Sequence, residues 1–408
     1  RTAASQPTES PRADIPGPDH VQAMTTATRL RAFGTTIFSE MSAIAARTDA
    51  INLGQGFPDT DGPLEIIAAV ETAMRSGAAN QYAPLRGVPE LCAAVADHQR
   101  RRYGLDIDPD GGVQVTFGAT EAIAATMLGL LEPGDEVVVL EPFYDSYAAT
   151  IAMAGATRRL VTLRPPDFAL DLDALAAAAR GARMLVLNSP HNPTGRVLAR
   201  ADLETVARLC VENDLIAVTD EVYEHLVFDG EHIPLATLPG MAERTLTISS
   251  AGKSFSFTGW KVGWASGPPQ LVAAVGSAKQ FLSYSGGTPF QHAVAAALAD
   301  AERHVAPLCG TLQAGRDRLC DGLRAAGFGV SVPQGGYFVN ADIAPLGAGD
   351  ARAWCRALPE RAGVVAIPTS AFYDDADAGR TLVRFTFCKR PEVIEEAVAR
   401  LVTADGGV

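Results

Sequence analysis

The chain has 408 residues, of which 47% are hydrophobic and 20% are charged, an ordinary composition for a folded protein that is long enough for one large domain and a smaller one. Its formal net charge of −13 argues against nucleic acid as a partner, and no apolar stretch of about 18 residues predicts a membrane span. The six cysteines are scattered without a CxxC pair, which predicts free thiols in a reducing cytoplasm and neither a zinc site nor a disulfide framework.

Residues 1–27 are predicted to form a disordered extension, because up to about His20 they are rich in Pro, Ser, Thr, Ala and Asp. This segment lacks the apolar core of a secretory signal and contains acidic residues, which transit peptides avoid. A helical pattern near residues 23–46 follows and leads into a segment that contains glycines. We expect residues 28–62 to form an N-terminal segment that packs with the small domain.

The rest of the chain shows two patterns. Up to about residue 289, strand and helix signals alternate, which predicts an α/β domain over residues 63–300 with a mainly parallel sheet covered by helices. Residues 301–408 are predicted to form a smaller α+β domain, because a helix is followed by three strand-like runs and a last helix, at residues 336–341, 363–367, 382–387 and 392–402.

A candidate anion site follows the strand-like run at residues 113–117. The next residues, Gly118, Ala119 and Thr120, open a helix that is rich in small residues. A helix N-terminus offers free N–H groups and a positive dipole, so Ala119 and Thr120 are candidate phosphate binders. A simple strand-to-helix turn is the alternative.

Two further strand-like runs are followed by polar residues. The run at 184–187 leads into a Pro/Asn/Gly turn, in which Asn192 lies between proline-restricted neighbours. The run at 215–218 is typical of a fully buried strand in a parallel sheet, so Asp220 would lie at its carboxyl end, where open α/β sheets bind ligands. Tyr223 comes three residues later. A plain turn at Asn192 and a helix N-cap at Asp220 are the alternatives.

Lys253 indicates which chemistry these residues serve. It follows the apolar, β-branched stretch 245–248 and stands among small and hydroxyl residues, with Lys261 eight positions later. Partial desolvation and nearby positive charge lower the pKa of such a lysine, and a neutral amine can form a Schiff base with an aldehyde. Because Ser250 and Lys261 would supply a donor and a charge for a phosphate, the candidate cofactor is pyridoxal 5′-phosphate (PLP). Two ordinary surface lysines are the alternative.

This cofactor makes demands on the rest of the site. PLP withdraws electrons only while its pyridine nitrogen stays protonated, which requires a buried carboxylate beside that nitrogen. Asp220 would supply the carboxylate. Tyr223 and the side-chain amide of Asn192 can reach the phenolic oxygen of the ring.

Three of these motifs together resemble those of the fold-type I PLP-dependent aminotransferases of class I and II, namely Asn-Pro-Thr-Gly at 192–195, Asp-Glu-Val-Tyr at 220–223 and Ser-Ala-Gly-Lys at 250–253. Their order also matches, as do their spacings of 28 residues (192 to 220) and 33 residues (220 to 253). Segments 51–59 and 141–147 are similar to those of the branch that contains the kynurenine/glutamine, methionine and N-succinyldiaminopimelate aminotransferases. The resemblance covers about residues 28 to 403.

The resemblance implies an enzyme that moves the α-amino group of an L-amino acid to a 2-oxo acid by a ping-pong mechanism. Its large domain would contain a mainly parallel, seven-stranded sheet. Lys253 would hold the cofactor and then, as general base and acid, move the substrate α-proton. Asp220 and Tyr223 would assist as catalytic residues, and Asn192 would contact both cofactor and substrate.

The resemblance also implies roles for five residues that carry little signal of their own. Tyr144 would stack on the pyridine ring, and Arg384 would grip the substrate α-carboxylate with its planar guanidinium. Gly56 would allow the backbone to approach the substrate, and Phe38 would line the side-chain pocket. Tyr82 would reach the phosphate of the neighbouring subunit, which implies a homodimer with shared active sites.

The identity of the substrate stays open among methionine, glutamine, aromatic amino acids, N-succinyldiaminopimelate and a specialised intermediate. Gly286 stands about where the kynurenine enzymes have a large aromatic residue, which favours a roomier pocket. Arg86 either meets an anionic substrate or is a solvated surface arginine.

Other functions on the same scaffold are possible readings of these motifs. A PLP-dependent β-lyase or amino-acid oxidase would use the same Lys253 and Asp220. A PLP-binding transcription regulator would need a DNA-binding domain, for which the short N-terminal extension leaves no room. The complete set of cofactor residues argues against a degenerate structural homologue.

Overall fold

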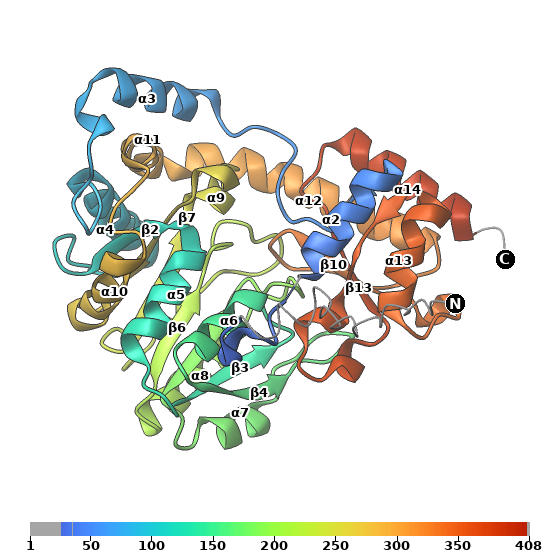
Figure 1. Cartoon of the computed structure of the whole chain (residues 1–408), viewed down its shortest axis with the longest axis horizontal. Helices are drawn as coiled ribbons and strands as arrows, with labels where there is room; N and C mark the ends of the chain where they lie inside the picture. The colour runs from blue at the N-terminus through green and yellow to red at the C-terminus, as the bar shows by residue number, and fades with distance from the viewer. Residues whose placement is uncertain (1–25, 35, 406–408) are drawn as a thin grey trace, which may run out of the picture.

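The computed structural model describes residues 26–34 and 36–405, which form a large sheet with its helices and a smaller C-terminal unit beside it (Figure 1). The predicted disordered extension, residues 1–27, therefore lies almost wholly outside the described residues. Within the described ranges, no helix has the length and the apolar character needed to cross a membrane. The predicted domain boundaries after residues 27, 62 and 300 stay predictions.

The large sheet has seven strands in the order β2-β8-β7-β6-β5-β3-β4, and all are parallel except β8. This result confirms the predicted mainly parallel sheet of seven strands. The strands are β2 (Val113–Phe117), β3 (Glu136–Glu141), β4 (Thr157–Thr162), β5 (Met184–Asn188), β6 (Ile216–Asp220), β7 (Thr245–Ser250) and β8 (Val262–Ser266). Every residue of β5, β6 and β7 is buried, as expected where helices cover both faces of a parallel sheet.

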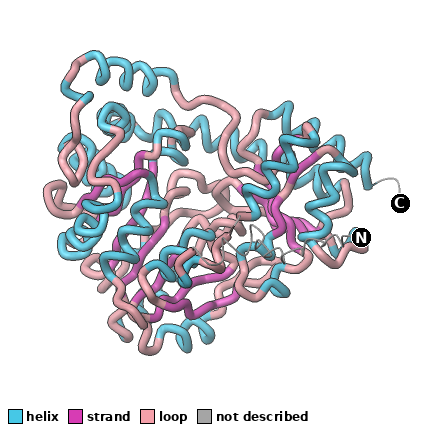
Figure 2. The backbone as a smooth tube through the Cα atoms, in the orientation of Figure 1, coloured by secondary structure: helices cyan, strands magenta, loops and turns pink. Residues whose placement is uncertain are grey.

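Helices lie on both faces of this sheet (Figure 2). Side chains of β3 alternate between two hydrophobic clusters, because successive residues of a strand point to opposite faces. Val137 and Val139 pack with helices α5, α6 and α10, whereas Val138 and Leu140 pack with α7 and α8. The bounds are α5 (Gly118–Leu130), α6 (Asp145–Met153), α7 (Leu172–Ala179), α8 (Arg200–Glu212) and α10 (Pro269–Leu282).

A third cluster covers the β2–β8 edge of the large sheet. It joins side chains of these strands to helices α3 (Leu64–Arg75), α4 (Pro89–Tyr103) and α11 (Thr288–Ala299). A helix of four residues, α9 (Ala251–Ser254), continues directly from β7. Seven short 3-10 helices complete the described chain, η1 (Thr28–Leu30), η2 (Ala78–Asn80), η3 (Leu235–Thr237), η4 (Thr258–Trp260), η5 (Ala344–Leu346), η6 (Thr369–Phe372) and η7 (Ala376–Gly379).

The C-terminal unit surrounds an antiparallel sheet of four strands in the order β12-β13-β10-β9. Its strands and helices are β9 (Gly329–Ser331), β10 (Phe338–Asp342), β12 (Ile367–Pro368), β13 (Leu382–Thr386), α12 (Ala301–Ala325), α13 (Ala351–Ala362) and α14 (Pro391–Asp405). Residues from the start of the chain join this unit, because α2 (Ile37–Thr48) packs into its core and β1 (Ile51–Asn52) pairs in parallel with β11 (Val364–Val365) (Figure 1).

The first helical pattern is shorter in the structure than the sequence predicts. Helix α2 begins only after Thr36, whose side-chain oxygen accepts a hydrogen bond from the Ser39 N–H at 3.2 Å. A threonine that caps a helix in this way has a non-helical backbone, so the pattern that starts near residue 23 does not continue as one helix.

Candidate active site

A cavity of about 360 Å³ opens at the carboxyl ends of β5, β6 and β7, where the C-terminal unit faces the large sheet. The structure brings together here every predicted cofactor-binding and substrate-binding residue except Tyr82. Those that line the cavity are Phe38, Gly56, Ala119, Thr120, Tyr144, Asn192, Asp220, Tyr223, Ser250, Lys253, Lys261 and Arg384.

Lys253 projects into this cavity from the short helix α9. Its Nζ donates a hydrogen bond to the Gly56 carbonyl oxygen at 3.1 Å, and the ring centroids of Tyr223 and Tyr337 lie 5.6 and 5.1 Å from that nitrogen. Burial lowers the pKa of Lys253 to about 8, helped by the positive charge of Arg384. A minor fraction of this amine is therefore neutral near physiological pH, and most of it is neutral above its pKa of about 8; the neutral form is the one that a nucleophile or general base requires.

Asp220 ends the buried strand β6 and lies at the floor of the cavity. Burial raises its pKa to about 6, although the Tyr147 hydroxyl, which donates to its Oδ2 at 2.6 Å, acts in the opposite direction. Asp220 therefore stays mostly ionised at neutral pH and offers a negative charge to a cationic ligand atom. Sequence reasoning missed Tyr147, although it stands one helical turn after Tyr144 in α6.

A cradle for an anion forms where β2 leads into α5. Lys261 lies beside the start of α5, since a Cβ atom on Gly118 would be 3.5 Å from its Nζ. Gly263 allows this approach, because a Cβ there would come within 2.6 Å of the Gly118 carbonyl carbon. Ser250, at the end of β7, lines the same cavity. A hydroxyl, an ammonium group and a helix N-terminus together suit a phosphate group.

Two asparagine side chains connect the carboxylate end of the cavity to its arginine. Asn188 donates its Nδ2 to the Asp220 carbonyl oxygen at 2.7 Å and accepts the Asn192 N–H at 2.7 Å through Oδ1. Asn192 in turn accepts a hydrogen bond from Arg384 Nη1 at 3.1 Å. Sequence reasoning missed Asn188, and its position at the end of the buried strand β5 was the available signal.

Arg384 extends from β13 and is almost completely buried between aromatic rings. The Phe338, Phe372 and Phe38 ring centroids lie 3.9, 4.6 and 5.2 Å from its guanidinium carbon. Its Nη2 donates to the Gly54 carbonyl oxygen at 3.1 Å, but its Nε is buried without a partner among the described residues. Burial lowers the pKa of Arg384 to about 10, so it remains charged at neutral pH and can hold a carboxylate.

Gly56 lies at the point where the N-terminal segment crosses the cavity. A Cβ atom there would come within 2.2 Å of the Phe338 ring, so this position has no room for a side chain. Phe38 packs on Phe372 with 5.6 Å between ring centroids and adds an apolar wall. The backbone at Gly56 is therefore close to both Lys253 and the aromatic rings.

Three residues considered from the sequence lie away from this cavity. Tyr82 is 83% exposed, and its ring centroid lies 5.8 Å from that of Tyr284. Arg86 donates to the Gly111 carbonyl oxygen at 3.0 Å and is not part of the lining that this chain supplies. Gly286 is not part of that lining either, and it packs against Phe117, whose ring would lie 1.8 Å from an added Cβ.

Known proteins resemble this chain over nearly its whole length. A family model described as aminotransferase class I and II matches residues 48–401. The chain is 54% identical over 388 residues to a probable N-succinyldiaminopimelate aminotransferase of Mycobacterium tuberculosis, and the match covers 92% of the chain and 98% of that relative. It is 37% identical over 375 residues to the methionine aminotransferase of Escherichia coli, with 91% and 97% covered.

A solved structure resembles the fold to the same extent. The structure of N-succinyldiaminopimelate aminotransferase from Mycobacterium tuberculosis matches with a TM-score of 0.91 and 54% identity, and covers 93% of this chain and 100% of that chain. These comparisons confirm the resemblance to the fold-type I aminotransferases and to the branch that the motifs indicated.

Proposed function

The chain belongs to the class I and II aminotransferases and is a PLP-dependent aminotransferase, and we propose that Lys253 and the side chains around it in the cavity carry out its transamination. The observation that carries this proposal is a half-buried lysine with a lowered pKa and a buried carboxylate, Asp220, which face one cavity beside an anion cradle.

The residues of the cavity fit the cofactor at each of its functional groups. Ser250, Lys261 and the first turn of α5, with Ala119 and Thr120, would hold the phosphate. Asp220 would face the pyridine nitrogen, and Asn192 and Tyr223 would face the phenolic oxygen, with Tyr144 against the ring. When bound, PLP supplies an aldehyde for the amino group and an electron sink.

The side chains of this chain then divide the remaining work. Arg384 binds and orients the substrate α-carboxylate through its planar guanidinium, whose faces are covered by aromatic rings. Lys253, with a pKa of about 8, takes the α-proton as a neutral amine and returns it as an ammonium group. Asp220 would keep a negative charge beside the pyridine nitrogen, so that the ring can withdraw electrons.

We propose an N-succinyldiaminopimelate-type amino acid as the donor substrate. Its support is the relative of that name, which is 54% identical over 98% of its own length. Among the cations in the described lining, Lys253 and Lys261 serve the cofactor and Arg384 serves the α-carboxylate. The two other carboxylates of such a substrate, one on the far end of the pimelate and one on the succinyl group, would therefore need a cation from outside this lining.

A donor panel tests both function and substrate. Purified enzyme loaded with PLP should convert N-succinyl-LL-2,6-diaminopimelate, in the presence of 2-oxoglutarate, with a kcat/KM on the order of 10-fold or more above that of methionine. An equal or higher value for methionine would contradict the substrate proposal. Release of ammonia without any 2-oxo acid acceptor would instead indicate the lyase or oxidase alternative.

We also propose that the active enzyme is a homodimer in which Tyr82 reaches the phosphate of the partner's site. Tyr82 and Phe281 are 83% and 86% exposed, and Tyr284 lies against Tyr82. Large exposed apolar side chains that gather in one place are typical of an interface. The dimer would also bring a second set of side chains toward the open end of the cavity.

Complementation between two damaged chains tests the shared site. Lys253→Ala chains mixed with Tyr82→Phe chains should regain activity above either parent, because one site of each hybrid then has both native residues. If Tyr82→Phe alone is nearly fully active, a bulkier change such as Tyr82→Trp replaces it. A fully active monomer in sedimentation would contradict the proposal.

A cytoplasmic location is our proposal as well. Its support is that all six cysteines are free thiols. Cell fractionation should recover the protein with cytoplasmic markers, and recovery outside that compartment would contradict the location.

A further inference from the structure

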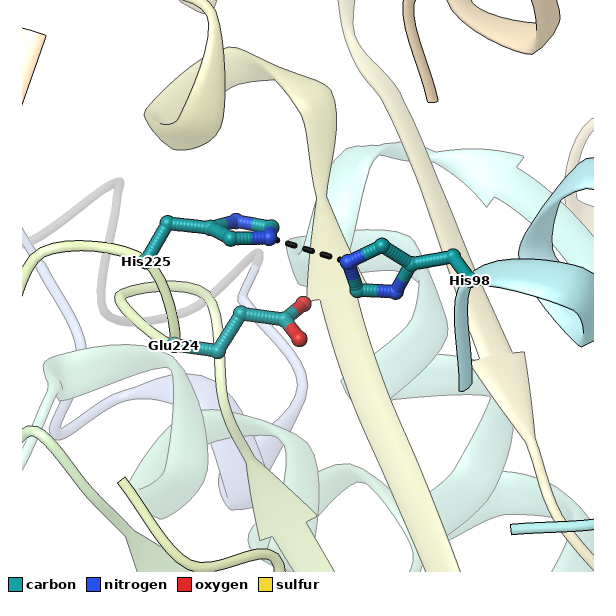
Figure 3. Close-up of side chains that lie close together, drawn as sticks. All are labelled: His98, Glu224 and His225. Atoms are coloured by element: carbon teal, nitrogen blue, oxygen red, sulfur yellow. Dashed lines mark hydrogen bonds between the residues drawn. The ribbon is translucent and has the colours of Figure 1, made fainter. Parts of the chain in front are cut away.

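A second group of buried ionisable side chains lies behind the wall of the cavity. His98 comes from α4, and Glu224 and His225 come from the turn after β6. Their exposed fractions are 4%, 1% and 5%, and none of them lines the cavity. Figure 3 shows the two rings facing one another, with the Glu224 carboxylate directed toward them. The proposed function assigns no role to this group.

The two histidines form a directed chain of hydrogen bonds. The Nε2 atoms of His98 and His225 are joined by a hydrogen bond (Figure 3) of 2.9 Å, and His225 Nδ1 lies 2.8 Å from Ser254 Oγ. Burial lowers the pKa of both rings, that of His225 to about 3, so each ring is neutral and has one N–H. His98 Nδ1 has no partner in the described part of the chain, and a buried N–H without a partner is rare. We therefore assign the proton of His98 to Nε2, which donates to His225, and the proton of His225 to Nδ1, which donates to Ser254.

Glu224 holds the same group together from the other side. Its two carboxylate oxygens accept the Ser249 hydroxyl at 2.6 Å and the Tyr103 hydroxyl at 2.8 Å. Burial alone would raise the pKa of Glu224, and the Ser249 hydroxyl, which donates to the carboxylate, acts in the opposite direction. Each oxygen of the buried carboxylate thus accepts a hydrogen bond, which compensates part of the cost of burying its charge.

Two histidines and a glutamate could also bind a metal ion, but their geometry favours hydrogen bonds. Zinc binds imidazole nitrogens at about 2.0–2.1 Å, and tetrahedral geometry then separates two such nitrogens by roughly 3.3 Å. The observed separation of 2.9 Å is the distance of a hydrogen bond. Both oxygens of Glu224 already accept hydroxyl donors.

The partners of this group are sequence neighbours of the proposed cofactor residues. Ser254 follows Lys253, and Ser249 precedes Ser250. Helix α9, which carries Lys253, has only four residues, and so short a helix has little stability of its own. The orientation of Lys253 must therefore depend on side chains that anchor α9 to the rest of the protein.

We propose that His98 and His225 are positioning residues that hold Lys253 in place through Ser254. This chain of hydrogen bonds from His98 through His225 to Ser254, which we call the relay, joins α4 and the turn after β6 to α9. It fixes the helix that carries the amine of Lys253. This inference rests on the proposed role of Lys253. It extends the machinery of the reaction to residues that touch neither the cavity nor a substrate.

The test removes the relay at its two ends. Ser254→Ala deletes the acceptor of His225 with little change of volume, and His98→Phe removes the first donor but keeps a ring. We expect kcat to fall on the order of 10-fold with KM little changed, because a misplaced base slows proton transfer. The pH midpoint of the visible absorbance band of bound PLP, which reports the proton on the Lys253 nitrogen, should move by about 0.5 pH unit or more. The double variant should lose little more than the worse single variant, because both act along one chain of bonds.

Gln99→Leu is the matched control. Gln99 is the next residue of α4, is fully buried, and its side-chain amide has no hydrogen-bond partner within the described ranges. This variant should leave kcat and the PLP band unchanged, whatever it does to the melting temperature. If Ser254→Ala and His98→Phe change only the melting temperature, as a purely structural role requires, the inference is wrong.

Elemental analysis and the lysine variant separate the remaining outcomes. A stoichiometric transition metal in the purified holoenzyme that is lost in His98→Phe would overturn the relay in favour of a metal centre. If Lys253→Ala remains active, the proposed function fails. If Lys253→Ala is inactive while Ser254→Ala and His98→Phe match Gln99→Leu, only the positioning inference fails.

Discussion

The two halves of the cavity are built in different ways. In the half formed by the large sheet, polar side chains follow neighbouring strand ends and are held by several fixed partners, as Asp220 is by Tyr147 and by the backbone of Val222. In the half formed by the C-terminal unit, one cation, Arg384, lies among aromatic rings with its Nε unpartnered among the described residues. The first arrangement suits a cofactor that stays bound, and the second suits a substrate that enters and leaves in every cycle.

The largest expected effect comes from the sheet half. Lys253→Ala should lower transamination on the order of 10⁴-fold, because it removes the general acid and base. Borohydride reduction of the wild-type holoenzyme followed by peptide mapping should place the cofactor label on Lys253. A label on another lysine, such as the buried Lys279, or a variant that keeps most of its activity would refute the assignment.

A second variant of the same half removes charge at nearly constant volume. Asp220→Asn should cost on the order of 10²-fold in kcat, because the pyridine proton loses its counter-charge. Asp145→Asn is the control, since Asp145 is another carboxylate in the same lining but has no assigned contact with the ring. Comparable losses in the two variants would mean that the cavity needs negative charge in general and not a carboxylate at residue 220.

The substrate half should respond through affinity. Arg384→Lys keeps the charge but loses the planar fork, so kcat/KM for the amino acid should fall roughly 10- to 100-fold, mainly through KM. Cofactor affinity, measured by titrating the cofactor-free protein with PLP, should stay unchanged. A large loss of PLP affinity would show that the two halves are not separate in function.

The smallest expected effect is a change in the pH dependence of kcat/KM, and it concerns the sheet half alone. The Tyr147 hydroxyl lowers the pKa of Asp220, so Tyr147→Phe should raise that pKa above its wild-type value. A larger fraction of Asp220 is then protonated at any given pH near 6, and the acidic limb of the kcat/KM profile should move to higher pH. We expect a loss of roughly fivefold on that limb, corresponding to about 1 kcal/mol for one hydrogen bond. An unchanged acidic limb would mean that Asp220 does not govern it.

The sheet half is also the part that the sequence predicts best. Asp220 and Ser250 follow buried, β-branched runs, so local pattern alone places them at strand ends. Asn188 ends a run of the same kind, but an asparagine before a proline-rich turn is equally typical of the turn itself. The motif around Lys253 is local in the same sense, and its spacing to the other motifs identified the family.

The substrate half and the relay depend on contacts that no local pattern encodes. Arg384 is surrounded by rings from residues 38, 338 and 372, which three separate chain segments bring together. His98 and His225 are 127 residues apart in the sequence. Each histidine alone is indistinguishable from an ordinary core histidine, so only the packing of α4 against the end of the large sheet reveals the pair.

The reversed direction of β8 has a consequence for the evolution and engineering of this enzyme. Because β7 and β8 are antiparallel neighbours, with Ser250 paired to Gly263, one connection over residues 251–261 carries both Lys253 and Lys261. That connection sets the distance between the lysine proposed for the aldehyde end of the cofactor and the lysine proposed for its phosphate end. An insertion or deletion between residues 253 and 261 would therefore change the separation of the two lysines directly.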